Sequence, residues 1–434
     1  LSKKMKHVKA IVSILMALVL FVSAQSFSLL AYAEETENTV YYLGDVNKSG
    51  SITAMDARLT LMFAAGTKTP TSEEYYYADY IDDGKISAMD ARMILKAAAG
   101  ATPLLLPTEK PKQPPKDVPT QEELKQKWIS SFSDKVSYSE LEDNLKWLVN
   151  DIGIRNWWNS SQNKAGDLLY NRLISYGFNA STCKKIDFKH GDVVGRNIMA
   201  TIPTSKSNAD IILIVAHYDT VGNTSGAVDN SSGVTTLLQL AKIFKQTQND
   251  YGVELRFLFT AGEEQGYYGA KNYVNTLSAT EKARHKLVYN MDMTAKPNSS
   301  YDPDGKYCIA ISTEPVSNKQ YTAPAAKPNF GTKAIDEAKA SLGNLGEYAY
   351  HSAVRAGKHD IMPFRKAGMT ALTVSWRDID ESRSDGADKG LAAPKLIHTT
   401  ADTFKNCDVM SLYNATVLIT NSIARLLVPY HGEF

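Results

Sequence analysis

Apolar residues in the second half of the chain form short continuous runs that alternate with amphipathic stretches. We predict strands at residues 211–216, 253–260, 287–291 and 370–376, and helices within 135–177, 233–246 and 269–277. Strands that are apolar along their whole length are covered on both faces. Alternation of such strands with helices predicts an α/β fold, a mixed and mostly parallel sheet with helices on both faces.

The first residues have a different pattern, typical of a secretory signal peptide. Four lysines within the first nine residues precede an apolar run over 11–22, and the small-residue sequence Ala31-Tyr32-Ala33 follows. A membrane anchor is the alternative, but the run has about 12 residues and a spanning helix needs ~20. We therefore expect residues 1–33 to be removed, and the rest of the chain to be secreted and extracellular without a membrane span.

An internal repeat follows. Residues 44–66 and 78–100 are identical at twelve of 23 positions at an offset of 34, which indicates a duplicated unit. Each copy has a polar loop and then a helix, predicted over 54–65 in the first copy. Oxygen donors at alternate loop positions, with glycine at the sixth, are typical of EF-hand calcium sites. The candidate calcium ligands are Asp45, Asn47, Ser49, Thr53 and Asp56 in the first loop and Asp79, Asp83, Ser87 and Asp90 in the second.

The second loop departs from this pattern at its third position. Ile81 stands there and offers no side-chain oxygen. We expect calcium to bind more weakly in that loop, or with a water in place of the missing ligand.

A duplicated loop–helix unit whose loops close with aspartate, and whose helices end in Ala-Ala-Gly, resembles dockerin repeats. Dockerins attach enzymes to cohesin domains of cellulosome scaffolds. The resemblance covers residues 41–100 and implies a small all-α module that binds Ca²⁺ and a cohesin domain of a scaffoldin. It also implies that the tenth and eleventh loop positions contact the cohesin, and these positions hold Ala54, Met55, Ala88 and Met89.

The composition changes after the repeat. Residues 101–119 are rich in proline and have no strand or helix period, which predicts an extended linker. The remaining residues, 120–434, are expected to form a separate domain. A net charge of +1 with 22% charged residues does not suggest a nucleic-acid-binding protein. Only three cysteines occur and none has metal-ligand spacing, so any zinc must be held by histidine and carboxylate groups.

Histidine and acidic residues follow several of the predicted strands. His217 and Asp219 come after strand 211–216, Glu263 and Glu264 after 253–260, and Asp292 after 287–291, while Asp229 and His398 lie in loops. Sites in open α/β sheets form at the carboxyl ends of strands. Such groups suit two zinc ions that share a bridging carboxylate, with one further carboxylate available to accept a proton from water.

The sequence AHYDTVG…GAVDNSSG…TAGEEQGYYGA…NMDM…HTTADT resembles secreted zinc aminopeptidases with two co-catalytic zinc ions. Their superfamily also includes glutamate carboxypeptidase II and glutaminyl cyclases. The resemblance spans about residues 135–430. It implies a zinc exopeptidase-like domain that hydrolyses peptides and binds two Zn²⁺.

The resemblance also implies a role for each site residue. It assigns one zinc to His217 and Asp292, the other to Glu264 and His398, and the bridge to Asp229. Glu263 would be the general base, and Asp219 would orient His217. A cis peptide bond between Asp229 and Asn230 is implied as well.

A later segment departs from the family. Ile361 stands where the family has an aromatic or imidazole group after Asp360, so details of the substrate pocket are expected to differ. Four other histidines lack a supporting motif, and we interpret them as ordinary surface or pocket residues: His285, His351, His359 and His431.

These observations predict a secreted metallo-exopeptidase that removes N-terminal amino acids and is attached to a cellulosome-type scaffold. A di-zinc carboxypeptidase or another exopeptidase is an alternative. A catalytically inactive cohesin-binding adaptor is another, against which the intact set of site residues argues. Glutaminyl cyclases use one zinc and lack the first histidine, so His217 argues against that activity. The preferred side chain of the substrate stays open.

Overall fold

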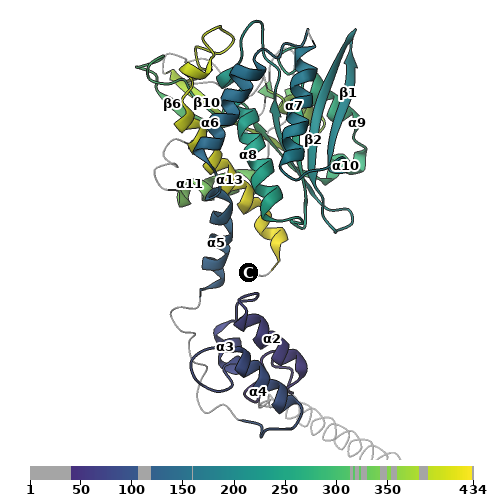
Figure 1. Ribbon diagram of the computed structural model, residues 1–434, viewed down its shortest axis with the longest axis vertical. Helices are drawn as coiled ribbons and strands as arrows, with labels where there is room; N and C mark the ends of the chain where they lie inside the picture. Colours follow the sequence, from purple (N-terminus) through teal and green to yellow (C-terminus); the bar gives the residue numbers. More distant parts are fainter. Residues whose placement is uncertain are drawn as a thin grey trace, which may run out of the picture. The chain divides into compact units, whose positions relative to one another are not determined.

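The computed structural model describes residues 41–105, 119–158, 160–312, 316–317, 322–323, 330–342, 349–352, 359–380 and 390–432. The expected signal peptide, residues 1–33, and residues 106–118 of the expected linker lie outside these ranges. The chain divides into two compact units between Glu123 and Leu124 (Figure 1). Across the described ranges, no helix is long and apolar enough to cross a membrane.

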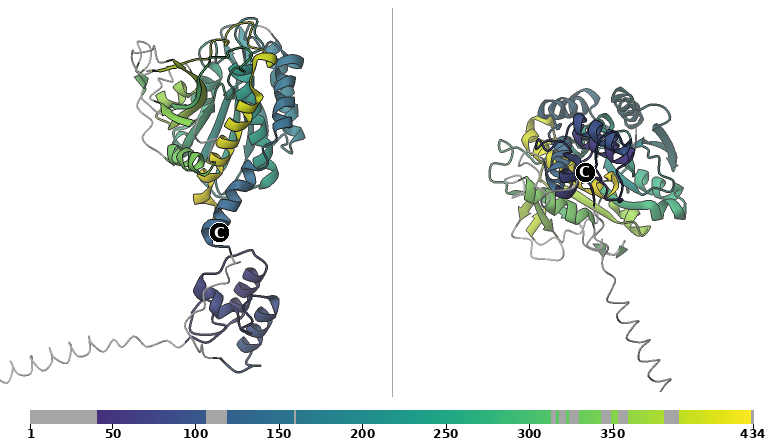
Figure 2. Two further views of the ribbon diagram at one scale, coloured as in Figure 1. Left: turned by 90° about the vertical axis from the view of Figure 1, so that its left-hand side faces the viewer. Right: turned by 90° about the horizontal axis from the view of Figure 1, so that it is seen from below.

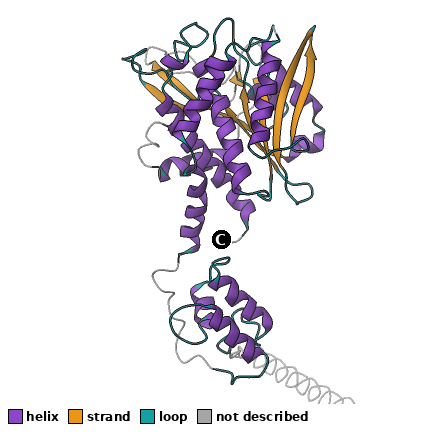
Figure 3. Ribbon diagram, viewed as in Figure 1, coloured by secondary structure: helices purple, strands orange, loops and turns teal. Residues whose placement is uncertain are grey.

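The first unit is built from loops and three helices within its described part (Figure 3). These are α2 (Ala54–Ala64), α3 (Ser72–Ala78) and α4 (Ala88–Ala98). Each begins with a capping box, in which Thr53, Thr71 or Ser87 exchanges hydrogen bonds with the third residue of the helix. The equivalent helices α2 and α4 pack together, and α3, which the sequence pattern did not predict, leads directly into the second loop.

The small core of this unit is formed by both repeats. Phe63 of α2 and Ile94 of α4 belong to it, together with Val46 and Tyr80 from the two loops. The ends of the unit also meet, because the backbone N–H of Leu43 donates to the carbonyl of Leu105 over 2.7 Å.

The second unit contains the sheet. Its described strands are β1 (Cys183–His190), β2 (Val193–Ile202), β3 (Ile211–His217), β4 (Glu254–Thr260), β5 (His285–Met291), β6 (Tyr307–Ser312), β7 (Val316–Ser317), β8 (Thr322–Ala323), β9 (Ala349–Ser352), β10 (Ala371–Asp380) and β11 (Gly390–Ala392). Its described helices are α5 (Gln121–Ser133), which begins just before the division, α6 (Tyr138–Lys146), η1 (Trp147–Ile152), α7 (Ser161–Ser175), η2 (Ala227–Ser231), α8 (Ser232–Thr247), α9 (Tyr268–Thr276), α10 (Ala279–Arg284), α11 (Phe330–Ser341), α12 (Ile361–Lys366), η5 (Phe404–Asn406) and α13 (Val409–His431).

The strand order of the main sheet is β1-β2-β4-β3-β5-β10-β6-β9, with β11 paired to β10. The predicted mixed sheet covered by helices is confirmed. Parallel pairing joins the central strands β4, β3, β5 and β10, and also β6 with β9, whereas the other described pairs of this sheet are antiparallel. The outer strands, such as β1, are partly exposed, so they lack the long apolar runs that revealed the centre.

Helices cover both faces of the sheet, as the fully buried strand β3 requires. Ile212 and Ile214 point into the larger core, which includes side chains of α6, α7, α8 and α13. The alternate residues Leu213 and Val215 point into a smaller core with α9 and α12. In the left panel of Figure 2 the C-terminal helix α13, drawn in yellow, runs along the face of the sheet that carries the larger core.

The segment predicted as helical over 135–177 is interrupted. Helix η1 ends at Ile152, and α7 begins only at Ser161. Gly153 has a φ of 73°, a left-handed conformation that ends the helix. The break places Arg155 in the interior of the unit, where its side chain is fully buried.

Candidate metal sites

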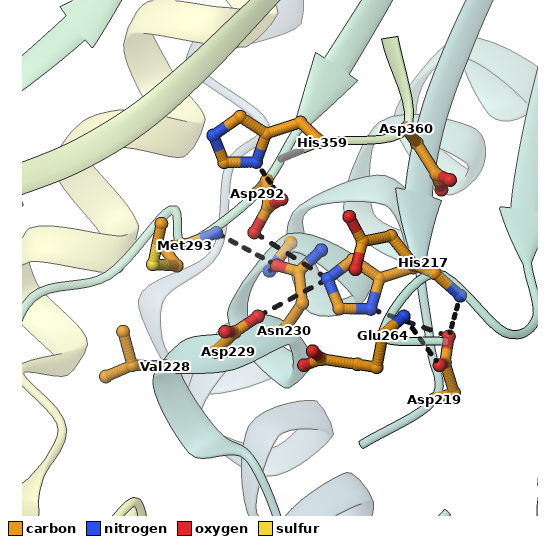
Figure 4. A network of polar contacts seen from close by, with 12 residues as sticks. His217, Asp219, Val228, Asp229, Asn230, Glu264, Asp292, Met293, His359 and Asp360 are labelled. Carbon is orange, nitrogen blue, oxygen red and sulfur yellow. Dashed lines mark hydrogen bonds and ion pairs between the residues drawn. The ribbon is translucent and has the colours of Figure 1, made fainter. Parts of the chain in front are cut away.

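Parallel strands bring three of the predicted zinc ligands of the second unit together (Figure 4). His217 is the last residue of β3, Asp292 directly follows β5, and Glu264 lies in the loop after β4. These three strands are neighbours and run in the same direction. Their carboxyl ends therefore meet at one edge of the sheet, as the sequence predicted.

Two groups of metal-ligand atoms face each other across Asp229. His217 Nε2 lies 3.3 Å from Asp229 Oδ1 and 3.7 Å from Asp292 Oδ1. His398 Nε2 lies 3.1 Å from Asp229 Oδ2 and 3.2 Å from Glu264 Oε2. Each oxygen of Asp229 thus belongs to a different group, which is the arrangement expected of a bridging carboxylate.

These distances fit tetrahedral zinc. Two ligand atoms that are each about 2.0–2.1 Å from a tetrahedral ion lie about 3.3 Å from each other. Ligand atoms of His217, Asp229 and Glu264 all lie within 4.8 Å of one another. One oxygen each of Glu263 and Glu264 is also buried without a hydrogen-bond partner. The donors present, imidazole and carboxylate, are those that zinc prefers.

The charge of this edge of the sheet also favours bound cations. Burial raises the pKa of Glu263 well above its ordinary value, and neighbouring Asp360, Glu264 and Asp292 raise it further against a lowering by His217. Burial and Asp229 likewise raise the pKa of Glu264 to about 7. Hydrogen bonds that His398 donates to Asp229 and Glu264 raise its pKa to about 10. Buried carboxylates that repel one another in this way would be stabilised by divalent cations.

Asp219 contacts the loop after β4 more closely than it contacts His217. Its Oδ1 lies 3.6 Å from His217 Nδ1, which is too long for a hydrogen bond. The same carboxylate accepts hydrogen bonds from the backbone N–H groups of Glu263, at 3.0 Å, and Glu264, at 3.2 Å. In this structure Asp219 therefore positions the two glutamates directly.

The loop that carries Asp229 is held by two residues whose roles the sequence reasoning missed. Asn230 accepts from the N–H of Met293 and donates to the carbonyl of Met291, both at 3.0 Å, so it ties Asp229 to the segment of Asp292. Asp402 accepts from the N–H of Val228 at 2.7 Å and of Asp229 at 3.1 Å. Asn230 lies in the DNSSG motif and Asp402 in the HTTAD motif, and this position beside proposed ligands could have indicated a supporting role.

Backbone geometry adds a second constraint to this loop. The Asp229–Asn230 peptide bond is cis, as predicted. A Cβ at Gly233 would lie 2.3 Å from Oδ1 of Asn230 and 2.6 Å from the carbonyl oxygen of Met291, so no larger residue fits there. The glycine therefore allows α8 to begin against the end of β5.

Arg155 holds the segment that connects His217 to Asp229. Its guanidinium donates to the carbonyl of Tyr218 at 2.5 Å and of Ser225 at 3.2 Å, and to the hydroxyl of Ser231 at 2.7 Å. Burial lowers its pKa to about 10, against an opposing effect of Asp219 and Asp402. This side chain joins both ends of the segment between His217 and Asp229, and no local sequence pattern marks it.

The interpretation of His359 as an ordinary histidine is wrong. Its side chain is buried, and its Nδ1 is hydrogen-bonded to Oδ2 of Asp292 (Figure 4). Burial alone would raise the pKa of Asp292, but His359 and His217 hold it well below its usual range. The neighbouring Asp360 is buried too, and accepts a hydrogen bond from Thr260. Sequence spacing gave no indication because His359 lies 67 residues after Asp292.

The predicted calcium loops of the first unit have matching geometry. In the first, Asp45 accepts from the N–H groups of Ser49 and Gly50, both at 2.9 Å. In the second, Asp79 accepts from Asp83 at 3.1 Å and Gly84 at 2.9 Å. The closing residues Asp56 and Asp90 accept from backbone N–H groups at the third and ninth loop positions in both copies. Ile81 leaves this backbone pattern unchanged and is exposed.

Apolar side chains are exposed at equivalent places of the two repeats. At the predicted partner-binding positions, Met55 is 61% exposed and Met89 is 50% exposed. The small residues beside them, Ala54 and Ala88, are exposed as well. Leu61 and Leu95, each six residues after the methionine of its repeat, are both 50% exposed. These leucines were missed by the sequence analysis, although their equivalence in the repeat was visible.

Comparison with known proteins agrees with both units. Residues 197–423 match the model of peptidase family M28, and residues 43–97 match that of the dockerin type I domain. Leupeptin-inactivating enzyme 1 of Streptomyces exfoliatus is 30% identical over 286 residues, which cover 64% of this chain and 58% of that protein. The chain spans about half the length of the first curated relatives it matches.

The fold also matches solved structures. A zinc aminopeptidase from Bacillus subtilis superposes with a TM-score of 0.52 at 15% identity, over 66% of this chain and 94% of that one. A glutaminyl cyclase from an Acidobacteriales bacterium superposes with a TM-score of 0.53 at 18% identity, over 68% and 96%. The family model covers more than half of the 434 residues. The chain therefore belongs to peptidase family M28 and carries a dockerin type I domain.

Proposed function

We propose that this chain is a secreted di-zinc exopeptidase that removes N-terminal amino acids from peptides and is tethered to a cellulosome-type scaffold by its dockerin. The observation that carries the proposal is the position of Asp229, whose two oxygens each lie within 3.3 Å of a different histidine. That arrangement supports two metal ions rather than one. Family membership supports peptide hydrolysis as the reaction.

The proposed ligands divide into two sets. His217 and Asp292 would hold one zinc, Glu264 and His398 the other, and Asp229 would contact both. When bound, zinc lowers the pKa of a coordinated water towards ~7 and polarises the carbonyl of the substrate.

Glu263 is the proposed general base. Its Oε1 is buried and has no hydrogen-bond partner, so it is available to accept the proton of the attacking water and to return it to the leaving amine. Asp219 would keep Glu263 and Glu264 in place through their backbone N–H groups. The adjacent residues Glu263 and Glu264 would then have different roles, with Glu264 binding a zinc ion and Glu263 transferring the proton.

The charge of the site supports recognition of a free N-terminus. A buried oxygen of Asp360 lacks a hydrogen-bond partner and would attract the α-ammonium group of a peptide. A carboxypeptidase instead needs a cation for the terminal carboxylate. In the described part of the chain, the guanidinium groups of Arg155 and Arg377 beside this site are already engaged by protein groups.

The first unit supports the proposed attachment and location. Its loops place side-chain oxygens at the positions where EF-hand sites bind calcium. The exposed pairs Met55 with Leu61, and Met89 with Leu95, offer the two repeats as similar surfaces for a cohesin domain. Cohesin-bound scaffolds act outside the cell, which agrees with the expected signal peptide at residues 1–33.

A panel of aminoacyl-anilides, each tested beside its N-acetylated form, would examine this function. We expect hydrolysis of the free forms, no hydrolysis of the acetylated forms, and loss of activity on zinc removal. Hydrolysis of an added N-acetylated dipeptide with a free C-terminus, without hydrolysis of the anilides, would favour the carboxypeptidase alternative. Two bound zinc ions without any hydrolysis would favour the inactive adaptor.

A further inference from the structure

His359 connects a proposed zinc ligand to a charged residue of another strand. On one side its Nδ1 is hydrogen-bonded to Oδ2 of Asp292, which follows β5. On the other side its Nε2 lies 2.6 Å from Nη2 of Arg377, which lies on the adjacent strand β10. His359 itself belongs to the segment just before α12 and is 4% exposed.

The chemistry of arginine decides the direction of these hydrogen bonds. A guanidinium group has only donors and stays protonated in proteins. Nε2 of His359 must therefore accept from Arg377, which leaves the ring N–H on Nδ1. The N–H at Nδ1 donates to Asp292. Arg377 therefore donates to His359, and His359 donates to the proposed zinc ligand.

One oxygen of Asp292 is occupied as a result. Oδ2 accepts from His359, and only Oδ1 remains on the side of His217 Nε2, at 3.7 Å. We infer that Arg377 and His359 are positioning residues that fix Asp292 as a one-oxygen ligand and thereby raise the zinc affinity of the His217–Asp292 position. The inference rests on the proposed di-zinc function.

The Glu264–His398 position has no comparable support for its ligands among the hydrogen bonds of the described residues. Oε1 of Glu264 is buried without a hydrogen-bond partner, and the side chain of His398 is 50% exposed, against 2% for His217. Loss of the Arg377–His359 contact should therefore weaken one of the two metal positions selectively.

The test measures zinc content of the full chain after equilibration with a graded series of chelator concentrations. His359→Leu removes both hydrogen bonds and should lower the affinity of one position by about 10–100-fold, as for other groups that hold metal ligands. His359→Asn places an amide donor where Nδ1 stood, so it should retain zinc nearly as well as the unaltered chain. Arg377→Met should fall between them.

His285→Leu is the matched control. His285 is also a buried histidine with a hydrogen bond at each nitrogen, to Tyr273 and to the carbonyl of Glu281, but it lies at the opposite end of β5 from Asp292. This substitution should lower the melting temperature without changing zinc retention. It separates general loss of packing from loss of metal affinity.

Equal zinc retention by the unaltered chain and His359→Leu would overturn the inference, and so would an equal loss in the Leu and Asn variants. If His359→Leu does not fold, unchanged zinc retention in Arg377→Met would overturn it instead. An unaltered chain that binds fewer than two zinc ions would contradict the proposed function itself.

Discussion

The two kinds of candidate metal site in this chain are assembled in opposite ways. In the dockerin, the donors of one loop lie within twelve residues, from Asp45 to Asp56, and backbone N–H groups of the same loop hold them. In the peptidase unit, the donors extend from His217 to His398 and meet because parallel strands end side by side.

This difference determines what each site depends on. A loop site carries its geometry with it, so duplication reproduced the same hydrogen bonds around Asp79 and Asp90, even with Ile81 between them. The strand-end site depends on residues that join distant segments, such as Asn230 and Asp402. A substitution in one dockerin loop should therefore affect only the calcium site of that loop. A substitution in the strand-end site should affect the whole site and lower function more severely.

The largest effect is expected at the strand-end site. General acid–base catalysis contributes about 10²–10⁴-fold, so Glu263→Ala should lower kcat by at least that much. Zinc should remain bound, because Glu263 is not a proposed ligand. Glu264→Ala should lose one metal as well as activity. Turnover of an aminoacyl-anilide and zinc stoichiometry, measured on both variants, check this expectation.

Glu281→Ala controls for removal of a glutamate side chain. Glu281 caps the short helix α10 and pairs with Arg256, and α10 precedes β5 at the end opposite Asp292, so this variant should keep both activity and zinc. If Glu263→Ala loses a zinc while Glu264→Ala keeps two, the two roles are reversed. Full activity of Glu263→Ala would contradict the mechanism.

A smaller and separate effect is expected in the dockerin. Its roughly 60 residues bury a small core, so calcium should contribute much of its folding free energy. Asp45→Ala and Asp56→Ala should weaken calcium-dependent cohesin binding and leave anilide hydrolysis unchanged. Titration of the full chain with calcium, followed by a binding assay and an activity assay, measures both.

Asp82→Asn is the control for this experiment, because it removes a negative charge from the second loop outside the proposed ligand positions. Its cohesin binding should stay close to that of the unaltered chain. Equal loss of cohesin binding and peptidase activity in the Asp45 and Asp56 variants would contradict independent units.

The smallest effect concerns the difference between the two loops. Ile81→Asn supplies an oxygen at the third position and should raise the calcium affinity of the second loop on the order of tenfold. Asn47→Ile should lower that of the first loop by a similar factor. The backbone hydrogen bonds to Asp90 and Asp56 are the same in both copies and survive both changes. Asn47→Ile also removes the hydrogen bond from the N–H of Ser49 to Asn47, but that N–H still donates to Asp45. Calorimetric titration would detect the shift, and identical affinities in all variants would refute it.

The order and types of residues along the chain were sufficient to predict which groups could perform the chemistry and to predict most of the central sheet. Apolar runs located β3, β4, β5 and β10 to within a few residues, because burial on both faces requires continuous apolar side chains. Knowing where the strands end was enough to bring His217, Glu264 and Asp292 to one edge. Loop spacing was enough for the calcium sites, since all their donors are local.

The groups that hold these donors in place became visible only in the folded chain. Arg155, His359 and Arg377 act through contacts with segments far away in the chain, and such contacts leave no periodic or spacing pattern in the sequence. A buried histidine beside a proposed zinc ligand and a histidine on the surface have the same letter in the sequence. What distinguishes them is the packing of α12 and β10 beside β5, which places His359 within hydrogen-bonding distance of Asp292.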